Sequence, residues 1–197
     1  MSRSSQADAA RNRAQVIEAT SHLLRERGAA GVSVQDAMSA AGLTHGGFYK
    51  HFASKDELLA TAARTAFDDI LERLERIARE SAAPADARER IISEYLTPQH
   101  RDTPATGCAN TALAADAARS ESIELREAYV SGFEQTLQRL EALTEGPDAR
   151  RRALQDLLVL VGGLTLARAT SGSAVSDEIL VEAEHLLHPR AGDAPRS

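Results

Sequence analysis

Residues 33–59 contain the pattern that most restricts how this chain can fold. Two short segments of helical character lie on either side of the tight turn Ala41-Gly42-Leu43-Thr44. Ser33 and Asp36 have the spacing of an N-terminal capping box for the first segment, with Asp in place of the usual Glu. Two short helices joined by a tight turn form a helix-turn-helix, a motif whose second helix enters the major groove of DNA.

The second of these segments, residues 44–51, has a composition that suits a helix placed in a DNA groove. It carries no acidic side chain that would repel phosphates. Gly46 and Gly47 allow the backbone to approach a partner closely, whereas two glycines in one short helix otherwise cost about 1 kcal/mol each. The candidates for contacts with base edges are Gln35, Thr44 and His45, and those for contacts with phosphates are Tyr49, Lys50, His51 and Lys55.

Helical periodicity recurs along the rest of the chain, and alternating strand patterns bounded by turn signals are absent. Ser54 and Glu57 form a second capping box at the start of a long helix. We expect an all-α fold with a loop over residues 97–106. The nine expected helices cover residues 8–27, 33–41, 44–51, 55–80, 86–96, 107–118, 122–144, 147–169 and 176–187.

Charge is distributed unevenly between the start of the chain and the remainder. The first 55 residues hold seven basic and four acidic residues, a net charge of +3, while the rest carries −9. A basic first part suits contact with nucleic acid. Cys108 is the single cysteine, which excludes an internal disulfide, and no apolar run is long enough to span a membrane. We therefore expect a cytoplasmic protein with no membrane partner.

Sequence motifs of the common catalytic sites are absent. The chain has no G-x-S-x-G elbow, P-loop, dinucleotide-binding fingerprint or H-E-x-x-H motif, and no His or Cys pair has metal-ligand spacing. A hydrolase built on Cys108 and His100 would lack an evident orienting acid. We expect no enzyme, no catalytic residue, no cofactor and no metal site.

Specific residues give the first third of the chain a family resemblance. They are Gly47-Phe48-Tyr49-Lys50-His51-Phe52, then Ser54-Lys55-Asp56-Glu57-Leu58, preceded by Ile17, Ala19, Leu23 and Gly28. With these residues, the segment resembles the DNA-binding part of TetR/AcrR-type regulators. Ala37-Met38 departs from the Ile-Ala usual in that family, a difference that affects packing and not the DNA-facing chemistry. The resemblance implies a three-helix DNA-binding domain over residues 8–53 and a helical ligand-binding and dimerisation domain over 54–188.

The resemblance also implies how such a chain would act. It predicts a homodimeric repressor that binds a palindromic operator in double-stranded DNA and is released by a small-molecule effector. Dimerisation is expected through apolar stripes on the last two helices, where Gly162-Gly163 would permit close approach. Polar candidates for the effector site are Tyr95, Cys108, Asn110, Tyr129 and Arg168.

Two alternatives stay open at this point. Cys108 lies at an expected helix start, where unpaired amides make a thiol more reactive, and residues 107–113 are similar to a segment of oxidant- or electrophile-sensing family members. The chain would then be a repressor that senses such compounds through Cys108; otherwise Cys108 is a small thiol lining the pocket. The second alternative is a DNA-binding dimer that takes no small-molecule ligand.

Overall fold

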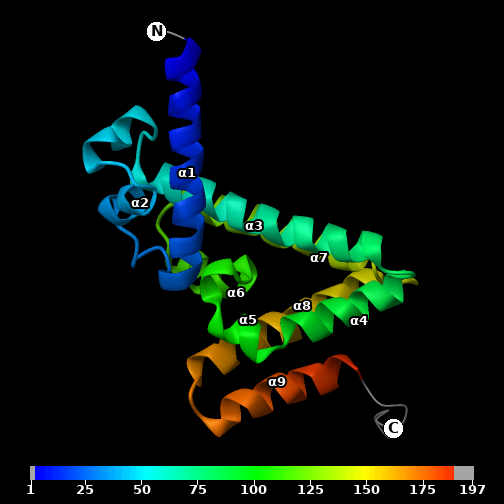
Figure 1. The fold of residues 1–197 in the computed structure, drawn as a ribbon. Helices are drawn as coiled ribbons and strands as arrows, with labels where there is room; N and C mark the ends of the chain where they lie inside the picture. The colour runs from blue at the N-terminus through cyan, green and yellow to red at the C-terminus, as the bar shows by residue number, and fades with distance from the viewer. Residues whose placement is uncertain (1–2, 189–197) are drawn as a thin grey trace, which may run out of the picture. The chain divides into compact units, whose positions relative to one another are not determined.

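The computed structural model describes residues 3–188, with side chains from Gln6 onward. Every regular element in this range is helical, which confirms the expected all-α class (Figure 1). The elements are α1 (Arg3–Arg27), α2 (Val34–Ala40), η1 (His45–Lys50), α3 (Lys55–Glu80), α4 (Pro84–Tyr95), α5 (Pro98–Asp102), η2 (Pro104–Thr106), α6 (Ala109–Arg119), α7 (Ile123–Glu141), α8 (Ala149–Ala169) and α9 (Ala174–Leu187). None of the helices within residues 3–188 combines the length and apolar character that crossing a membrane requires.

The prediction of a loop over residues 97–106 is wrong, because this stretch forms α5 and the 3-10 turn η2. The Thr97 hydroxyl accepts a hydrogen bond from the His100 amide at 3.1 Å and caps α5. Pro98 occupies the first turn of α5, where a missing N–H costs nothing. The two prolines of this segment therefore begin helical turns. The nine expected helices are all present, and α1 begins five residues before the expected residue 8.

Side-chain caps explain why α2 and α3 begin where they do. Asp36 N–H donates to the Ser33 hydroxyl at 3.1 Å and Ser33 N–H donates to the Asp36 carboxylate at 3.0 Å, a complete capping box. The Ser33 hydroxyl also donates to the Asp36 carboxylate, and this bond, followed by that from the Ser33 N–H, lowers the pKa of Asp36 below its usual value. At α3 the Glu57 N–H donates to the Ser54 hydroxyl at 3.0 Å, as in a capping box. The box is modified because the Glu57 carboxylate accepts from the Ala53 amide, at 2.7 Å, and not from the amide of Ser54 itself.

Contacts divide the described chain into two compact units. The first contains the residues up to Ile70 together with Pro104–Phe133, and the second contains Leu71–Thr103 and the residues from Glu134 onward. The long helices α3 and α7 each contribute residues to both units. The expected functional boundary between residues 53 and 54 concerns DNA and ligand binding and stays a prediction.

The first unit has two apolar clusters. One lies under α2 and η1 and is built from Val16, Ala37, Met38, Phe48, Phe52 and Leu58. The other joins the C-terminal part of α1 to α3, α6 and α7, and it includes Leu24, Phe67 and Leu113. Gly132 on α7 packs directly on the Phe67 ring, because a Cβ placed there would lie only 2.1 Å from a ring carbon.

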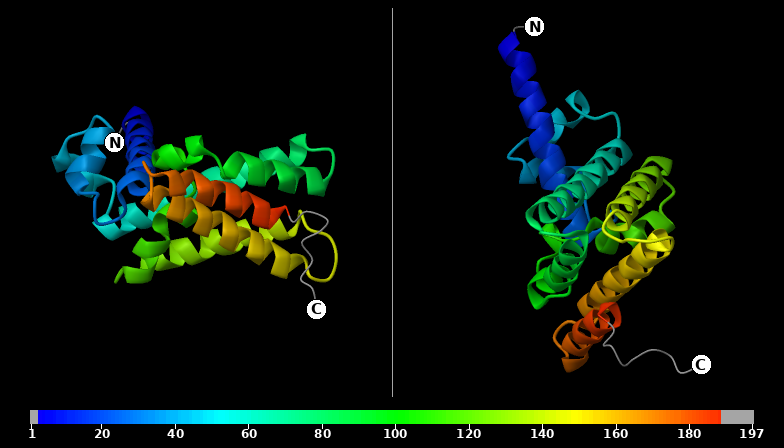
Figure 2. Two further views of the ribbon diagram at one scale, coloured as in Figure 1. Left: turned by 90° about the horizontal axis from the view of Figure 1, so that it is seen from below. Right: turned by 90° about the vertical axis from the view of Figure 1, so that its right-hand side faces the viewer.

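The second unit is organised by the pairing of α8 with α9, which lie side by side in both views of Figure 2. Gly163 belongs to this pairing, since a Cβ there would lie 2.8 Å from the Ala183 side chain. The expected role of Gly162-Gly163 between two chains is therefore wrong for Gly163, which gives close packing within the chain. Gly162 has open space beside it.

A buried histidine connects α4 to α5 in the second unit. His100 is 8% exposed, and its Nδ1 lies 2.8 Å from the Tyr95 carbonyl oxygen, to which it donates. Burial lowers the pKa of His100 from 6.5 to about 4, and the charges of Arg168 and Arg73 act in the same direction. The folded protein therefore keeps this imidazole neutral at a pH where an unfolded chain already binds a proton.

We expect acid to destabilise the fold through His100. Above pH 6.5 the residue does not reduce the free energy of unfolding. As the pH falls from 6.5 towards 4, only the unfolded state takes up the proton, and the free energy of unfolding falls by up to about 3 kcal/mol. Urea unfolding at pH 7.5 and pH 4.5 of the wild type and of His100→Asn, which can still donate to the Tyr95 carbonyl, measures this loss. Equal losses in the two proteins would show that carboxylates, and not His100, set the acid sensitivity.

Candidate nucleic-acid interface

The turn between α2 and the recognition segment η1 requires its glycine. Gly42 has φ +70°, a left-handed conformation that side-chain-bearing residues rarely adopt. Gly42 N–H donates to the Ser39 carbonyl at 2.9 Å and Leu43 N–H donates to the Met38 carbonyl at 2.9 Å. These bonds satisfy the last carbonyls of α2 and reverse the chain within four residues.

Two phenylalanines attach η1 to the first unit. Phe48 and Phe52 are 1% and 2% exposed, and their rings stack with centroids 5.6 Å apart. Tyr49 points the other way, with 80% of its surface exposed and only an edge contact to Phe48. η1 is a 3-10 helix, and the side chain of Thr44, its N-cap residue, forms no hydrogen bond that caps it. The segment is therefore held by its apolar side and presents its polar side to solvent.

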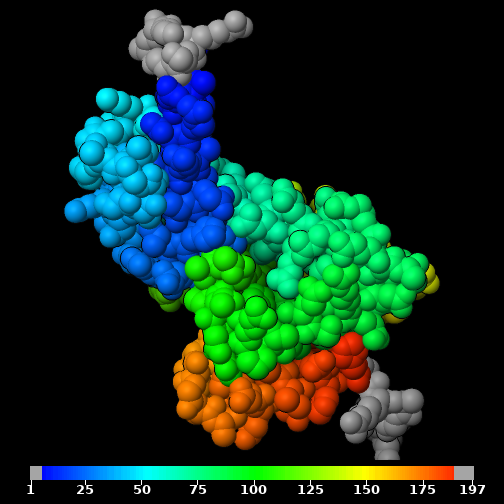
Figure 3. All heavy atoms as spheres, viewed as in Figure 1, coloured from blue at the N-terminus to red at the C-terminus, as the bar shows by residue number. Residues whose placement is uncertain are grey.

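The structure places all eight predicted DNA-contacting residues in the first unit. Six of them are exposed, namely Gln35, Thr44, His45, Gly46, Tyr49 and Lys50, while His51 and Lys55 are half-buried. The region around η1 forms part of the molecular surface (light blue in Figure 3). A Cβ added at Gly46 would meet nothing within 4 Å, so internal packing does not demand glycine there. The expected role of Gly46 in close approach to an external partner stays a prediction.

An arginine that sequence analysis missed fixes the end of η1. The Arg13 guanidinium donates to the His51 carbonyl at 3.3 Å and to the Glu57 carboxylate at 3.3 Å, and it lies 4.9 Å above the centre of the Phe52 ring. One side chain of α1 thus holds both the recognition segment and the start of α3. Because its partners are 38 and 44 residues away along the chain, no local sequence pattern predicts these contacts.

The candidates for the effector site fall into two groups. Cys108, Asn110 and Tyr129 lie in the first unit, where the Tyr129 hydroxyl donates to the Asn110 carbonyl at 3.3 Å. Burial raises the pKa of Tyr129, and the nearby Cys108 adds to the effect. Cys108 is buried, with 5% of its surface exposed.

The other two candidates, Tyr95 and Arg168, lie in the second unit. Arg168 donates to the main-chain carbonyls of His100 at 2.8 Å and Arg101 at 3.2 Å. The Tyr95 ring makes an edge contact with the His100 ring, with ring centroids 4.5 Å apart. These contacts give Arg168 a part in joining α5 to α8. A role for either residue in effector binding stays a prediction.

In the part of the chain that the structure describes, no group of three His, Cys, Asp or Glu residues is arranged to hold a metal ion.

Comparison with known proteins agrees with this geometry. Residues 16–62 match the sequence model of "Bacterial regulatory proteins, tetR family". The HTH-type transcriptional regulator PksA of Bacillus subtilis is 32% identical over 98 residues, 50% of this chain and 47% of that protein. The HTH-type transcriptional repressor DhaR of Mycobacterium sp. strain GP1 is 25% identical over 74% of each chain. The chain spans about half the length of the first curated relatives it matches, all of which are named as transcriptional regulators and none as enzymes.

Solved structures extend the likeness over nearly the whole fold. A TetR-family regulator from Cytophaga hutchinsonii superposes with a TM-score of 0.76 at 20% identity, covering 92% of this chain and 95% of the other. The reduced form of NemR from E. coli superposes with a TM-score of 0.74 at 18% identity, covering 89% and 95%. At these identities the structures establish the shared fold.

We expect Arg13→Ala to lower the free energy of unfolding by about 1–2 kcal/mol, because it removes a charged hydrogen bond, a half-exposed ion pair and a cation–π contact together. Thermal and urea unfolding measure the change. Arg11→Ala is the matched control, since Arg11 is exposed on the same helix and pairs only with the exposed Asp8, and it should change stability by less than about 0.5 kcal/mol. Equal effects of the two substitutions would contradict the special role of Arg13.

Proposed function

The chain belongs to the tetR family of bacterial regulatory proteins, and from this premise we propose that it is a homodimeric transcriptional repressor, released from a palindromic operator by a small-molecule effector. The observation that carries the proposal is the recognition segment itself. It is free of acidic residues, it is anchored by buried Phe48 and Phe52, and it exposes Tyr49, Lys50 and an otherwise unexplained Gly46. A regulator of this kind meets its DNA in the cytoplasm.

Contact with DNA divides between two kinds of residue. Thr44, His45 and Gln35 are exposed near the starts of η1 and α2, which suits hydrogen bonds to base edges. Tyr49, Lys50 and the half-buried Lys55 suit phosphate contacts, which supply affinity and fix the register of the protein on the duplex. In a two-fold dimer, the two recognition segments meet half-sites about 34 Å apart or a multiple of this, so the operator is an inverted repeat.

The surface of α8 and α9 supports dimerisation. Each helix buries one side within the second unit, through Leu160 and Leu164 on α8 and Leu180 on α9. The stripes expected to form the interface are therefore partly internal. Exposed apolar side chains remain on the outer faces, namely Leu154, Leu158, Leu166, Val175, Val181 and Leu186. Apolar surface gathered on neighbouring helices is typical of a subunit interface, and Gly162 leaves room for a second backbone among them.

Release by an effector requires that the effector bind the DNA-free form more tightly than the DNA-bound form. Within the first unit, α1 offers a physical connection. Arg25 on α1 is buried, pairs with Asp69 on α3 at 2.9 Å and donates to the Gly107 carbonyl at 3.4 Å, next to Cys108. A ligand that displaces the start of α6 would thus act on the helix that also holds the recognition segment. Sensing through Cys108 would use the same connection, although its sulfur is buried.

We expect Tyr49→Ala to weaken operator binding at least tenfold. The operator is first recovered from genomic DNA by selection on the immobilised protein, and affinity is then measured by fluorescence anisotropy at 50 and 200 mM salt. Binding by the wild type should fall steeply with salt, because phosphate contacts release counterions. Tyr49→Phe, which keeps the ring and lacks the hydroxyl, should lose less. If selection enriches no sequence, the chain is not a sequence-specific repressor.

We expect Leu158→Glu to raise the dimer dissociation constant at least tenfold, because it would bury an unpaired charge in the interface. Sedimentation over a range of protein concentrations measures this constant. Ser93→Glu on α4 places the same charge on an exposed polar site and should leave the constant unchanged. A fully dimeric Leu158→Glu variant would exclude this face as the interface.

A further inference from the structure

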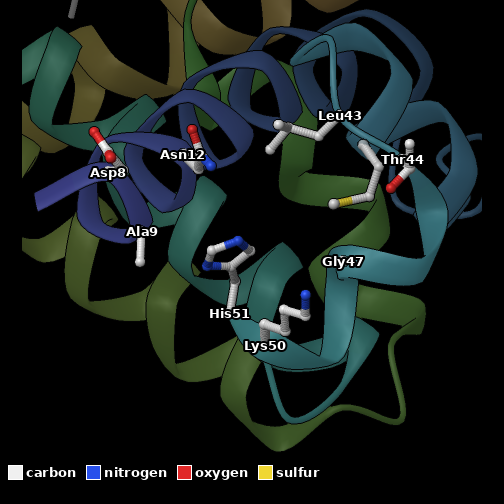
Figure 4. A pocket seen from close by; sticks show the side chains of 9 residues that line it. Asp8, Ala9, Asn12, Leu43, Thr44, Gly47, Lys50 and His51 are labelled. Carbon is white, nitrogen blue, oxygen red and sulfur yellow. The ribbon is translucent and has the colours of Figure 1, made fainter. Parts of the chain in front are cut away.

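A cleft of about 420 Å³, lined by both polar and apolar residues, lies within the first unit between the N-terminal half of α1 and the recognition segment. Its volume is within the range of small-molecule pockets. α1 contributes Asp8 and Asn12 to its lining, while Thr44, Lys50 and His51 line it from the other side (Figure 4). The sequence analysis assigned no role to the α1 side of this cleft.

The side chains around the cleft offer hydrogen-bond donors that the fold leaves unused. Across residues 3–188, no hydrogen bond or ion pair engages the Asn12 amide, the Lys50 ammonium or the His51 ring nitrogens. The Thr44 hydroxyl makes no cap bond to η1. The single acidic group of the lining, Asp8, forms an ion pair with Arg11 one turn along α1, which offsets its negative charge.

Arg13 fixes the two walls of the cleft in place. It follows Asn12 in α1, and its guanidinium donates to the main-chain carbonyl of His51. Asn12 and His51 are therefore held at opposite sides of one space before any ligand arrives. A preformed set of donors loses little conformational entropy when an anion binds.

The chemistry of this lining selects an anion with several acceptor oxygens. An ammonium, an amide N–H₂ and an imidazole N–H can all donate to non-bridging phosphate oxygens. The cleft also lies beside the exposed Thr44 and Lys50, which the proposed function already places against DNA. We propose that the cleft binds a backbone phosphate of the operator, and that Asn12 is a DNA-contacting residue supplied by α1. This inference rests on the proposed function.

A phosphate contact made by Asn12 has a distinctive consequence. It adds affinity and fixes the register, and it carries no direct information about base sequence. Loss of Asn12 therefore weakens binding to the operator and to unrelated duplexes by similar factors. Loss of a residue that reads bases would weaken operator binding selectively.

The test compares two isosteric charge substitutions on the same helix. Asn12→Asp places a carboxylate in the cleft, whereas Gln15→Glu places one on an exposed position of α1 outside it. Fluorescence anisotropy on the selected operator and on an unrelated duplex of equal length should show at least a tenfold loss of affinity for Asn12→Asp on both. Asn12→Ala should lose three- to tenfold, and Gln15→Glu less than twofold, with the melting temperatures of all variants unchanged.

Several results would overturn the inference without touching the proposed function. Wild-type affinity in Asn12→Asp, while Tyr49→Ala loses binding, would show that no phosphate enters the cleft. A loss confined to the operator would make Asn12 a base-reading residue. Stabilisation of the wild type, but not of Asn12→Asp, by inorganic phosphate at constant ionic strength, with unchanged DNA affinity, would make the cleft a site for free phosphate alone. Failure of the wild type to bind any DNA would instead overturn the proposed function.

Discussion

Burial of Phe48 and Phe52 is the interaction on which the candidate interface depends. η1 has six residues and two glycines, so it has little intrinsic helical stability. Removing two phenyl rings from water contributes several kcal/mol, which is enough to hold such a segment against its neighbours. Tyr49, between them, is exposed because its neighbours point inward. The apolar side of the segment thereby determines the direction of its polar side.

α1 is the element through which the first unit is held together. Arg13 binds the end of η1 and the start of α3, and Arg25 binds Asp69 of α3 and the carbonyl of Gly107 before α6. Both arginines use the planar guanidinium to reach more than one partner, which lysine cannot do with the same geometry. α1 therefore contacts the recognition segment through its N-terminal half and the start of α6 through its C-terminal end. A regulator needs such a continuous element if events at α6 are to affect DNA binding.

Comparison of particular elements shows where sequence reasoning succeeded and where it failed. The helix starts at α2 and α3 could be predicted because capping boxes are local, and both Ser33 and Ser54 accept the expected amide. The loop at residues 97–106 was misread, because a proline signals a turn equally well whether it ends a helix or begins one. Gly163 was assigned to an interface between chains, although its contact with Ala183 lies within one chain.

The sequence by itself determined the all-α class, the position of the recognition segment and the identity of its exposed residues. These features depend on periodicity, caps and turn glycines, which act over a few residues and can be read directly. Only the tertiary structure showed the Arg13 contacts, the division of α8 and α9 into a buried and an exposed face, and the cleft between Asn12 and His51. These features bring together side chains dozens of residues apart. Their geometry follows from how helices pack, which local sequence does not specify.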